Sequence, residues 1–253
     1  MNEIIIETQG LTKRFGHFTA VDHITFDVHR GEIFGFLGAN GAGKSTAMRM
    51  LCGLSQPTEG KGSVAGFDIA REYEQIKKNI GYMSQRFSLY EELKVWENMR
   101  LFGGIYGMKD DAIARQTDEV LSRLHFLSEK NTLVKDLPLG WKQKLAFSVA
   151  VFHSPKIVFL DEPTGGVDPE TRRQFWELIY EAANERDITV FVTTHYMDEA
   201  EYCNRISIMV SGRIEALGSP EELRHQYQVD SIETVFTRLA RGGEKPEEKG
   251  GAQ

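Results

Sequence analysis

A glycine-rich segment at residues 38–46, Gly-Ala-Asn-Gly-Ala-Gly-Lys-Ser-Thr, constrains the fold of this chain more than any other feature. It fits the pattern G-x-x-x-x-G-K-[ST], and it lies between a short apolar run at 33–37 and a helical pattern that begins near residue 44. Glycines let the backbone curl without Cβ clashes, so several N–H groups converge on one concave site. A strand, such a loop and a helix in this order predict a phosphate-binding loop (P-loop).

The loop residues have distinct expected tasks. Lys44 is expected to reach the β- and γ-phosphates of a nucleotide, and the Ser45 hydroxyl is expected to ligate Mg²⁺. The alternative is a flexible glycine-rich turn, which the strand before the loop and the helix after it make less favourable. The residues expected to hold the phosphates are Gly38, Asn40, Gly41, Gly43, Lys44, Ser45 and Thr46.

The pattern of apolar residues predicts an α/β fold. Apolar runs rich in β-branched residues at 33–37, 157–160 and 188–193 are typical of strands covered on both faces, as in a parallel sheet. Residues 3–30 alternate between apolar and polar, which predicts half-exposed antiparallel strands, and a last strand pair is expected near 205–217. Helical patterns alternate with the apolar runs, as in parallel α/β sheets. They lie at 44–53, 93–125, 141–153, 169–186 and 196–202.

We expect one domain over residues 1–240. Its sheet core is expected at about 1–85 and 154–240, with a helical segment at about 86–153 inserted between the two parts. One large domain fits the 253 residues. Residues 241–253 have one alanine as their only apolar residue, so we expect a disordered tail there.

Composition and charge exclude several classes of protein. The formal net charge of -7 argues against a nucleic-acid partner, because phosphate neutralisation needs a basic face. No apolar run approaches the ~18 residues that span a bilayer, so we expect no direct membrane insertion. The first seven residues lack the positive region of a signal peptide, and two cysteines, Cys52 and Cys203, form no disulfide framework. These features favour a cytoplasmic location.

A second polar site follows the apolar run at 157–160, where Asp161 and Glu162 stand at the end of the predicted strand. The carboxyl edge of a parallel sheet is where α/β proteins bind ligands. Asp161 is expected to support Mg²⁺ through water, and Glu162 to act as general base for an attacking water. The pair could also be an ordinary solvated strand end, but a P-loop in the same chain favours the functional interpretation.

These motifs, in their order and spacing, resemble the nucleotide-binding domain of ATP-binding-cassette (ABC) proteins over roughly residues 4–238. The resemblance implies a P-loop NTPase (RecA-like) core sheet, an N-terminal antiparallel β subdomain and an inserted helical subdomain, with ATP and Mg²⁺ as ligands. The segments Leu-Pro-Leu-Gly-Trp-Lys-Gln (137–143) and Thr-Gly-Gly-Val-Asp-Pro (164–169) look most like the ATPases of ABC-2 type and drug exporters.

The resemblance also implies roles for single residues. Phe15 looks like the aromatic that stacks on adenine, and Gln85 like the glutamine that links the Mg²⁺ site to a membrane partner. Asp168 looks like the D-loop aspartate and His195 like the switch histidine that contacts the γ-phosphate. Taken singly, Phe15 could be a core residue and His195 an ordinary histidine. The implied catalytic residues are Glu162, His195, Gln85 and Lys44, and the implied Mg²⁺ site comprises Ser45, Gln85 and Asp161, the last through water.

The segment 137–143 stands in the place of the family's signature motif, L-S-G-G-x-x-Q, and departs from it. Pro138 replaces the serine whose hydroxyl bonds the γ-phosphate of the opposite subunit, and Leu139 replaces the first glycine. Gly140 and the start of the following helix remain. We therefore expect Gly140 to face a nucleotide held by a second subunit, in trans, with one hydrogen bond fewer than usual.

The mechanism implied by the resemblance is ATP-dependent dimerisation, with the same chain or with a homologous ATPase, followed by hydrolysis. The dimer would energise transmembrane permease subunits at the inner face of the membrane, through residues 86–90 beside Gln85. One alternative is a soluble ABC-type ATPase of translation, repair or chromosome organisation. Another is a small-molecule kinase with a P-loop, which leaves the segment 137–143 and His195 without a role.

Overall fold

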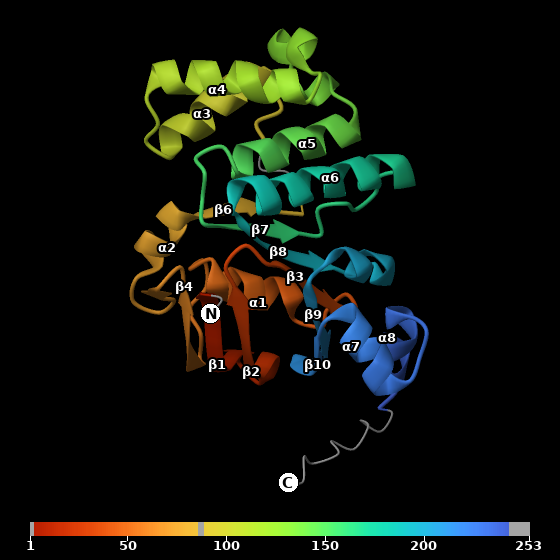
Figure 1. Ribbon diagram of the computed structural model, residues 1–253. Coiled ribbons are helices and arrows are strands. Elements are labelled where there is room, and N and C mark those ends of the chain that lie inside the picture. Colours follow the sequence, from red (N-terminus) through yellow and green to blue (C-terminus); the bar gives the residue numbers. More distant parts are fainter. Residues whose placement is uncertain (1–2, 86–88, 243–253) are drawn as a thin grey trace.

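The computed structural model describes residues 3–85 and 89–242, and within them the strands form two sheets (Figure 1). A six-stranded sheet has the order β10-β9-β3-β8-β7-β6, and a four-stranded sheet has the order β2-β1-β4-β5. The larger sheet contains β3 (Ile33–Gly38), β6 (Ile80–Met83), β7 (Ile157–Asp161), β8 (Thr189–Thr194), β9 (Arg205–Val210) and β10 (Arg213–Gly218). The smaller contains β1 (Ile4–Phe15), β2 (Phe18–His29), β4 (Glu59–Val64) and β5 (Phe67–Asp68).

The predicted buried strands are confirmed in the larger sheet. Every residue of β3, β7 and β8 is buried, and these strands pair in parallel with one another and with β6 and β9. Only β10 runs antiparallel, next to β9, which confirms the predicted last strand pair near 205–217. Parallel strands end at the same edge of a sheet, so the residues after β3, β7 and β8 emerge side by side.

Helices cover both faces of the larger sheet (Figure 1). Helix α1 packs with the smaller sheet on one face, where the Phe191 ring lies 5.3 Å from both Phe36 and Phe159 between ring centroids. Helices α5 and α6 pack on the other face. The helices are α1 (Lys44–Leu51), α2 (Tyr73–Asn79), α3 (Val95–Ile105), α4 (Asp110–Arg123), α5 (Leu139–Ala150), α6 (Pro169–Arg186), α7 (Pro220–Tyr227) and α8 (Ile232–Ala240).

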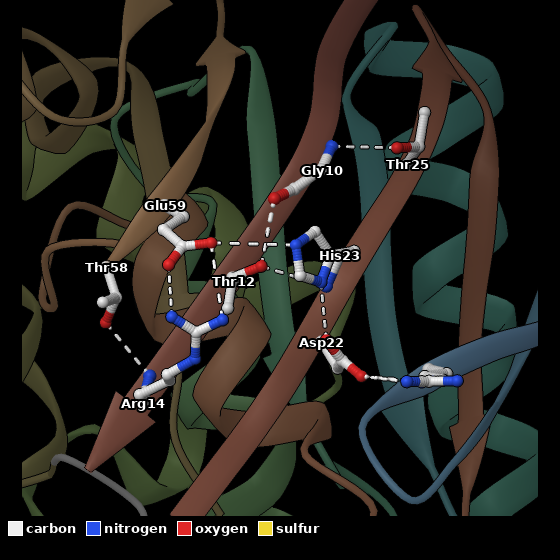
Figure 2. Close-up of polar contacts among 9 residues, drawn as sticks. Gly10, Thr12, Arg14, Asp22, His23, Thr25, Thr58 and Glu59 are labelled. Carbon is white, nitrogen blue, oxygen red and sulfur yellow. Dashed lines mark hydrogen bonds and ion pairs between the residues drawn. The ribbon is translucent and has the colours of Figure 1, made fainter. Parts of the chain in front are cut away.

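The alternating pattern of residues 3–30 corresponds to β1 and β2, which pair antiparallel as predicted. The register shifts several times along this pair, and side chains satisfy the backbone there (Figure 2). The Thr12 hydroxyl accepts a hydrogen bond from the His23 N–H at 3.0 Å and donates to the Gly10 carbonyl at 3.1 Å. His23, in the left-handed region with φ 53°, is held by Asp22 Oδ1 at 2.6 Å from its Nδ1. Polar contacts thus fix an irregular stretch of the smaller sheet.

The stretch predicted as helical over 93–125 is helical, but it is divided into two parts. The segment contains two helices, α3 and α4, because the chain turns at Gly107, whose φ of +76° is a left-handed conformation that ends helices. Both helices pack with α5 in a separate apolar cluster around Met99, Leu121 and Leu145. The segment predicted as helical at 196–202 forms a 3-10 helix, η3 (Met197–Tyr202), and two further short 3-10 turns are η1 (Leu127–Asn131) and η2 (Val134–Asp136).

The predicted limits of the inserted segment and the tail fall partly outside the described residues, since 86–88 and 243–253 are not among them. Before the tail, α7 begins with Ser219 as N-cap and Pro220 as first residue, and α8 ends at Ala240. In residues 3–85 and 89–242, no helix combines the length and the apolar character needed to cross a bilayer.

His153, in the turn after α5, is a histidine whose burial couples stability to pH. Its Nε2 lies 3.1 Å from the Ile80 carbonyl oxygen, and its ring stacks on Tyr106 with 3.5 Å between centroids. Within the described part of the chain, its buried Nδ1 has no hydrogen-bond partner. Burial, assisted by the charge of Arg186 and partly opposed by the Ile80 hydrogen bond, lowers the pKa of His153 from 6.5 to about 4.

We therefore predict that the free energy of unfolding decreases as the pH is lowered from 6.5 to 4. In this range the unfolded chain binds a proton at His153 and the folded chain does not. His153→Gln should reduce this slope, which urea unfolding at a series of pH values would measure. His17→Gln, which changes an exposed histidine, should keep the wild-type slope. A His153→Gln profile parallel to that of the wild type would contradict the prediction.

Candidate nucleotide-binding site

The predicted phosphate loop joins β3 to α1 at the carboxyl edge of the larger sheet. Gly38 and Gly43 are required by packing: a Cβ at Gly38 would lie 2.5 Å from the Met209 carbonyl oxygen, and one at Gly43 would lie 2.3 Å from that of Ala20. Gly43 also has φ +106°, and Gly41 has φ +81° with open space around it. The loop is thus pressed between β9 and β2, while its exposed part, with Asn40 and Gly41, faces outward.

Lys44 carries the positive charge of the loop in a nearly enclosed position. Its side chain is 4% exposed. Its Nζ donates to the Gly38 carbonyl at 2.8 Å and to the Ala39 carbonyl at 3.2 Å. The first N–H groups of α1, at Lys44, Ser45 and Thr46, lack i−4 partners within the helix, as at every helix start. The loop therefore presents one ammonium group and a helix N-terminus together, an arrangement that favours phosphate.

Two of the three residues predicted to hold Mg²⁺, Ser45 and Asp161, are in contact, whereas Gln85 contacts Glu162. Ser45 Oγ donates to Asp161 Oδ1 at 3.1 Å, and Thr193 Oγ1 donates to the same oxygen at 2.7 Å. Asp161 is buried at the end of β7. A hydroxyl and a carboxylate are hard oxygen donors of the kind Mg²⁺ takes alongside substrate phosphates. The donor set present therefore fits a magnesium ion.

Glu162 is the point on which the predicted catalytic residues converge. Its Oε1 lies 3.3 Å from Lys44 Nζ, and its Oε2 accepts a hydrogen bond from Gln85 Nε2 at 3.0 Å. His195 Nδ1 lies 3.1 Å from Oε2, in a contact that lacks the angle of a hydrogen bond. Glu162 has φ +49°, a conformation rare outside glycine, and its N–H donates to the Thr193 carbonyl at 3.1 Å. Strand β8 thus supports the turn that aims Glu162 at these partners.

Phe15 is the last residue of β1, with 55% of its surface exposed. This exposure excludes the interpretation of Phe15 as a core residue. Lys13 Nζ lies 5.2 Å from the ring centroid, and Phe18 stands opposite Phe15 in the hairpin with 64% exposed. Stacking on adenine stays a prediction. Sequence reasoning missed Phe18, although its place three residues after Phe15, across a glycine turn, was a signal.

Gly140 and Asp168 line a different hollow, of about 340 Å³, formed by residues 138–141 and 166–168 with neighbouring α5 and α6 side chains. None of the residues 38–46 lines it. Asp168 is the N-cap of α6: its Oδ1 accepts from the N–H groups of Glu170 and Thr171, each at 3.0 Å. Hydrogen bonds from Thr171 lower the pKa of Asp168. Gly140 and Asp168 therefore do not share a hollow with the chain's own phosphate loop, as expected if they contact a nucleotide held by a second subunit.

Gly140 also lies at a close contact between α5 and α6. A Cβ at Gly140 would lie 2.6 Å from Thr171 Cγ2, so a side chain here requires Thr171 on α6 to shift. Leu139, in contrast, is 45% exposed at the first residue of α5. Buried Gln143, at the end of the signature segment, donates to the Gly165 carbonyl at 3.3 Å and joins α5 to the loop after β7.

Sequence reasoning also missed Thr193, which holds both Asp161 and Glu162 in place. Its side chain is buried beneath the site. The available signal was its position at the polar end of the apolar run 188–193, two residues before His195.

The chain is similar to known proteins over most of its length. The family model described as ABC transporter matches residues 21–165, more than half of the chain. The probable multidrug ABC transporter ATP-binding protein YbhF of Escherichia coli (strain K12) is 45% identical over 248 residues, which are 96% of this chain and 43% of YbhF. The linearmycin resistance ATP-binding protein LnrL of Bacillus subtilis (strain 168) is 33% identical over 229 residues, 90% of this chain and 73% of LnrL.

Solved structures include a dimeric bacterial ABC transporter cassette that matches with a TM-score of 0.77 and 25% identity, covering 85% of this chain and 98% of that chain. This chain spans less than half the length of YbhF.

Leu139 offers a test of the hollow that does not disturb packing. We predict that Leu139→Asp weakens ATP-dependent self-association and ATP hydrolysis, because it places a carboxylate where a partner's phosphate is expected, and like charges at an interface cost several kcal/mol. Nucleotide binding to the monomer should persist. Leu139→Asn, of nearly the same size and without charge, is the matched control. Analytical ultracentrifugation with and without ATP would measure association; equal behaviour of the two variants would argue against a phosphate at this hollow.

Proposed function

The chain belongs to the ABC transporter family as one of its ATP-binding domains, and we propose that it hydrolyses ATP to energise a membrane exporter of the ABC-2 type. The observation that carries this proposal is the convergence of Lys44, Gln85 and His195 on Glu162 at the edge of the sheet. The names of the similar proteins, a multidrug transporter and a linearmycin resistance protein, support export over a soluble role in translation or repair.

The phosphate loop would bind the β- and γ-phosphates of ATP through its N–H groups and Lys44. In doing so, Lys44 Nζ would exchange its contacts with Gly38, Ala39 and Glu162 for phosphate oxygens. Ser45 and Asp161, with Gln85, would hold Mg²⁺, which when bound neutralises charge on the phosphates. The exposed Phe15 ring would stack on adenine.

Glu162 would act on the water that attacks the γ-phosphorus. The water's oxygen forms a bond to phosphorus, the bond to the oxygen bridging to the β-phosphate breaks, and the water's proton passes to the Glu162 carboxylate. Gln85 and His195 flank that carboxylate and would orient it and the γ-phosphate. Once Lys44 turns to phosphate, Glu162 loses its ion-pair partner and becomes free to accept the proton.

A second subunit, either the same chain or a homologous ATPase, would complete the site with Gly140 and the start of α5. The position of the hollow away from the chain's own phosphate loop supports this arrangement, as does the likeness to a dimeric cassette. The dimer would lie at the inner face of the membrane on transmembrane permease subunits. The proposed permease contact at 86–90 lies partly outside the described residues; Tyr90, within them, is 55% exposed.

Glu162→Gln tests the general base. The amide keeps the size of the side chain but cannot take the proton, so we predict that kcat falls by about 10²–10⁴ while nucleotide affinity is retained. Phosphate release and titration with a fluorescent nucleotide would measure the two quantities. Glu221→Gln, an exposed change on α7, is the control. Turnover within about threefold of the wild type would remove Glu162 from this role.

Lys44→Met tests the phosphate cradle. Methionine retains the buried stem but removes the charge, and a hydrogen bond to a charged group contributes about 1.5–3 kcal/mol. We therefore predict that ATP affinity weakens by roughly 10- to 150-fold, in contrast to Glu162→Gln. Lys78→Met, at an exposed position of α2, should leave the affinity unchanged. Equal nucleotide affinity in the Lys44 variant and the wild type would contradict the cradle.

A further inference from the structure

Glu199 is a buried carboxylate that the proposed reaction does not use. It lies in η3 and its surface is 0% exposed. A carboxylate taken out of water is costly unless hydrogen bonds and a nearby cation compensate. The hydrogen-bond and ion-pair partners of Glu199 therefore show how the cost of burying its carboxylate is offset.

The carboxylate accepts hydrogen bonds from two threonines of different segments. Its Oε2 accepts from Thr194 Oγ1 at 2.6 Å, and its Oε1 accepts from Thr164 Oγ1. Arg172 Nε, from α6, lies 3.7 Å from Oε1, an ion-pair distance that balances the charge but is too long for a hydrogen bond. Glu199 thus joins the end of β8 to the loop after β7.

Both threonines are close in sequence to the reacting groups. Thr194 directly precedes His195, and its hydroxyl also accepts from the Tyr196 N–H at 3.0 Å, so both flanks of His195 are held. Thr164 lies two residues after Glu162, in a turn where the Gly165 N–H donates to the Glu162 carbonyl at 3.3 Å. One buried carboxylate therefore fixes the segments that carry Glu162 and His195 relative to each other.

We propose that Glu199 is a positioning residue for ATP hydrolysis. It sets the separation of the Glu162 loop and the end of β8, and with it the 3.1 Å approach of His195 Nδ1 to Glu162 Oε2. The inference rests on the proposed roles of Glu162 and His195. Charged and polar groups that act in a transition state lose effect when displaced by as little as 1 Å, so a loosened tie lowers kcat.

Glu32 provides a matched control for a merely structural carboxylate. It is 7% exposed, accepts a hydrogen bond from the His29 N–H at 2.7 Å and pairs with Arg205 at 3.4 Å. It lies immediately before β3, at the edge of the sheet opposite the nucleotide site. Glu32→Gln and Glu199→Gln thus make the same chemical change at two buried ion pairs, only one of which contacts the site's loops.

The experiment measures kcat and KM for ATP, nucleotide affinity and Tm for the wild type and both variants. We expect both substitutions to lower Tm. Only Glu199→Gln lowers kcat, by about 10- to 100-fold, with nucleotide affinity within about threefold of the wild type. A kcat for Glu199→Gln equal to that for Glu32→Gln overturns the inference. A wild-type chain without ATP turnover overturns the proposed function itself.

Thr164 supplies a second test that leaves Glu199 in place. Thr164→Ser retains the hydroxyl that donates to Glu199 and is expected to keep kcat within about twofold of the wild type. Thr164→Val has nearly the same shape but no hydroxyl, and kcat is expected to fall by about tenfold or more. Equal kcat for the serine and valine variants overturns the inference.

Discussion

In the larger sheet, Leu37 of β3 pairs with Thr194 of β8, and Asp161 of β7 pairs with Thr193 beside it. This parallel register is the constraint from which the candidate site follows, because it ends three strands at one edge. The glycine-rich loop, the acidic pair and His195 therefore follow strands that end side by side. The Thr193 hydroxyl and carbonyl reach the acidic pair directly from the neighbouring strand. A shift of one residue in the register would separate these groups.

The ion pair between Lys44 and Glu162 gives the site its electrostatic character. The two side chains are only 4% and 9% exposed, so neither charge is well solvated. Removing one partner of a buried pair leaves the other uncompensated, which is strongly unfavourable. A bound triphosphate, under the proposed function, replaces the carboxylate as partner of the ammonium group. Nucleotide binding and the release of Glu162 are then the same event.

Features that depend on local sequence were predicted, whereas contacts between residues distant in sequence were not. The glycine-rich loop and the buried strands are short motifs with their own physical cause, and the structure contains both. The pattern over 93–125 predicted helix correctly but not its division at the left-handed glycine Gly107. The contact of Gly140 with Thr171 and the tie of Glu199 to Thr164, 35 residues away, leave no trace in local sequence. The roles of the site residues remain predictions that the experiments above test.

Asp168 ends the loop expected to face a second subunit, and the same carboxylate caps α6 through the N–H groups of Glu170 and Thr171. A partner that draws this carboxylate away must replace those bonds, and the loss of an N-cap destabilises a helix by about 0.5–2 kcal/mol. That range corresponds to roughly a 2- to 30-fold weakening of association. Under the proposed function, the cap therefore lowers the net gain from a subunit contact that would displace the Asp168 carboxylate.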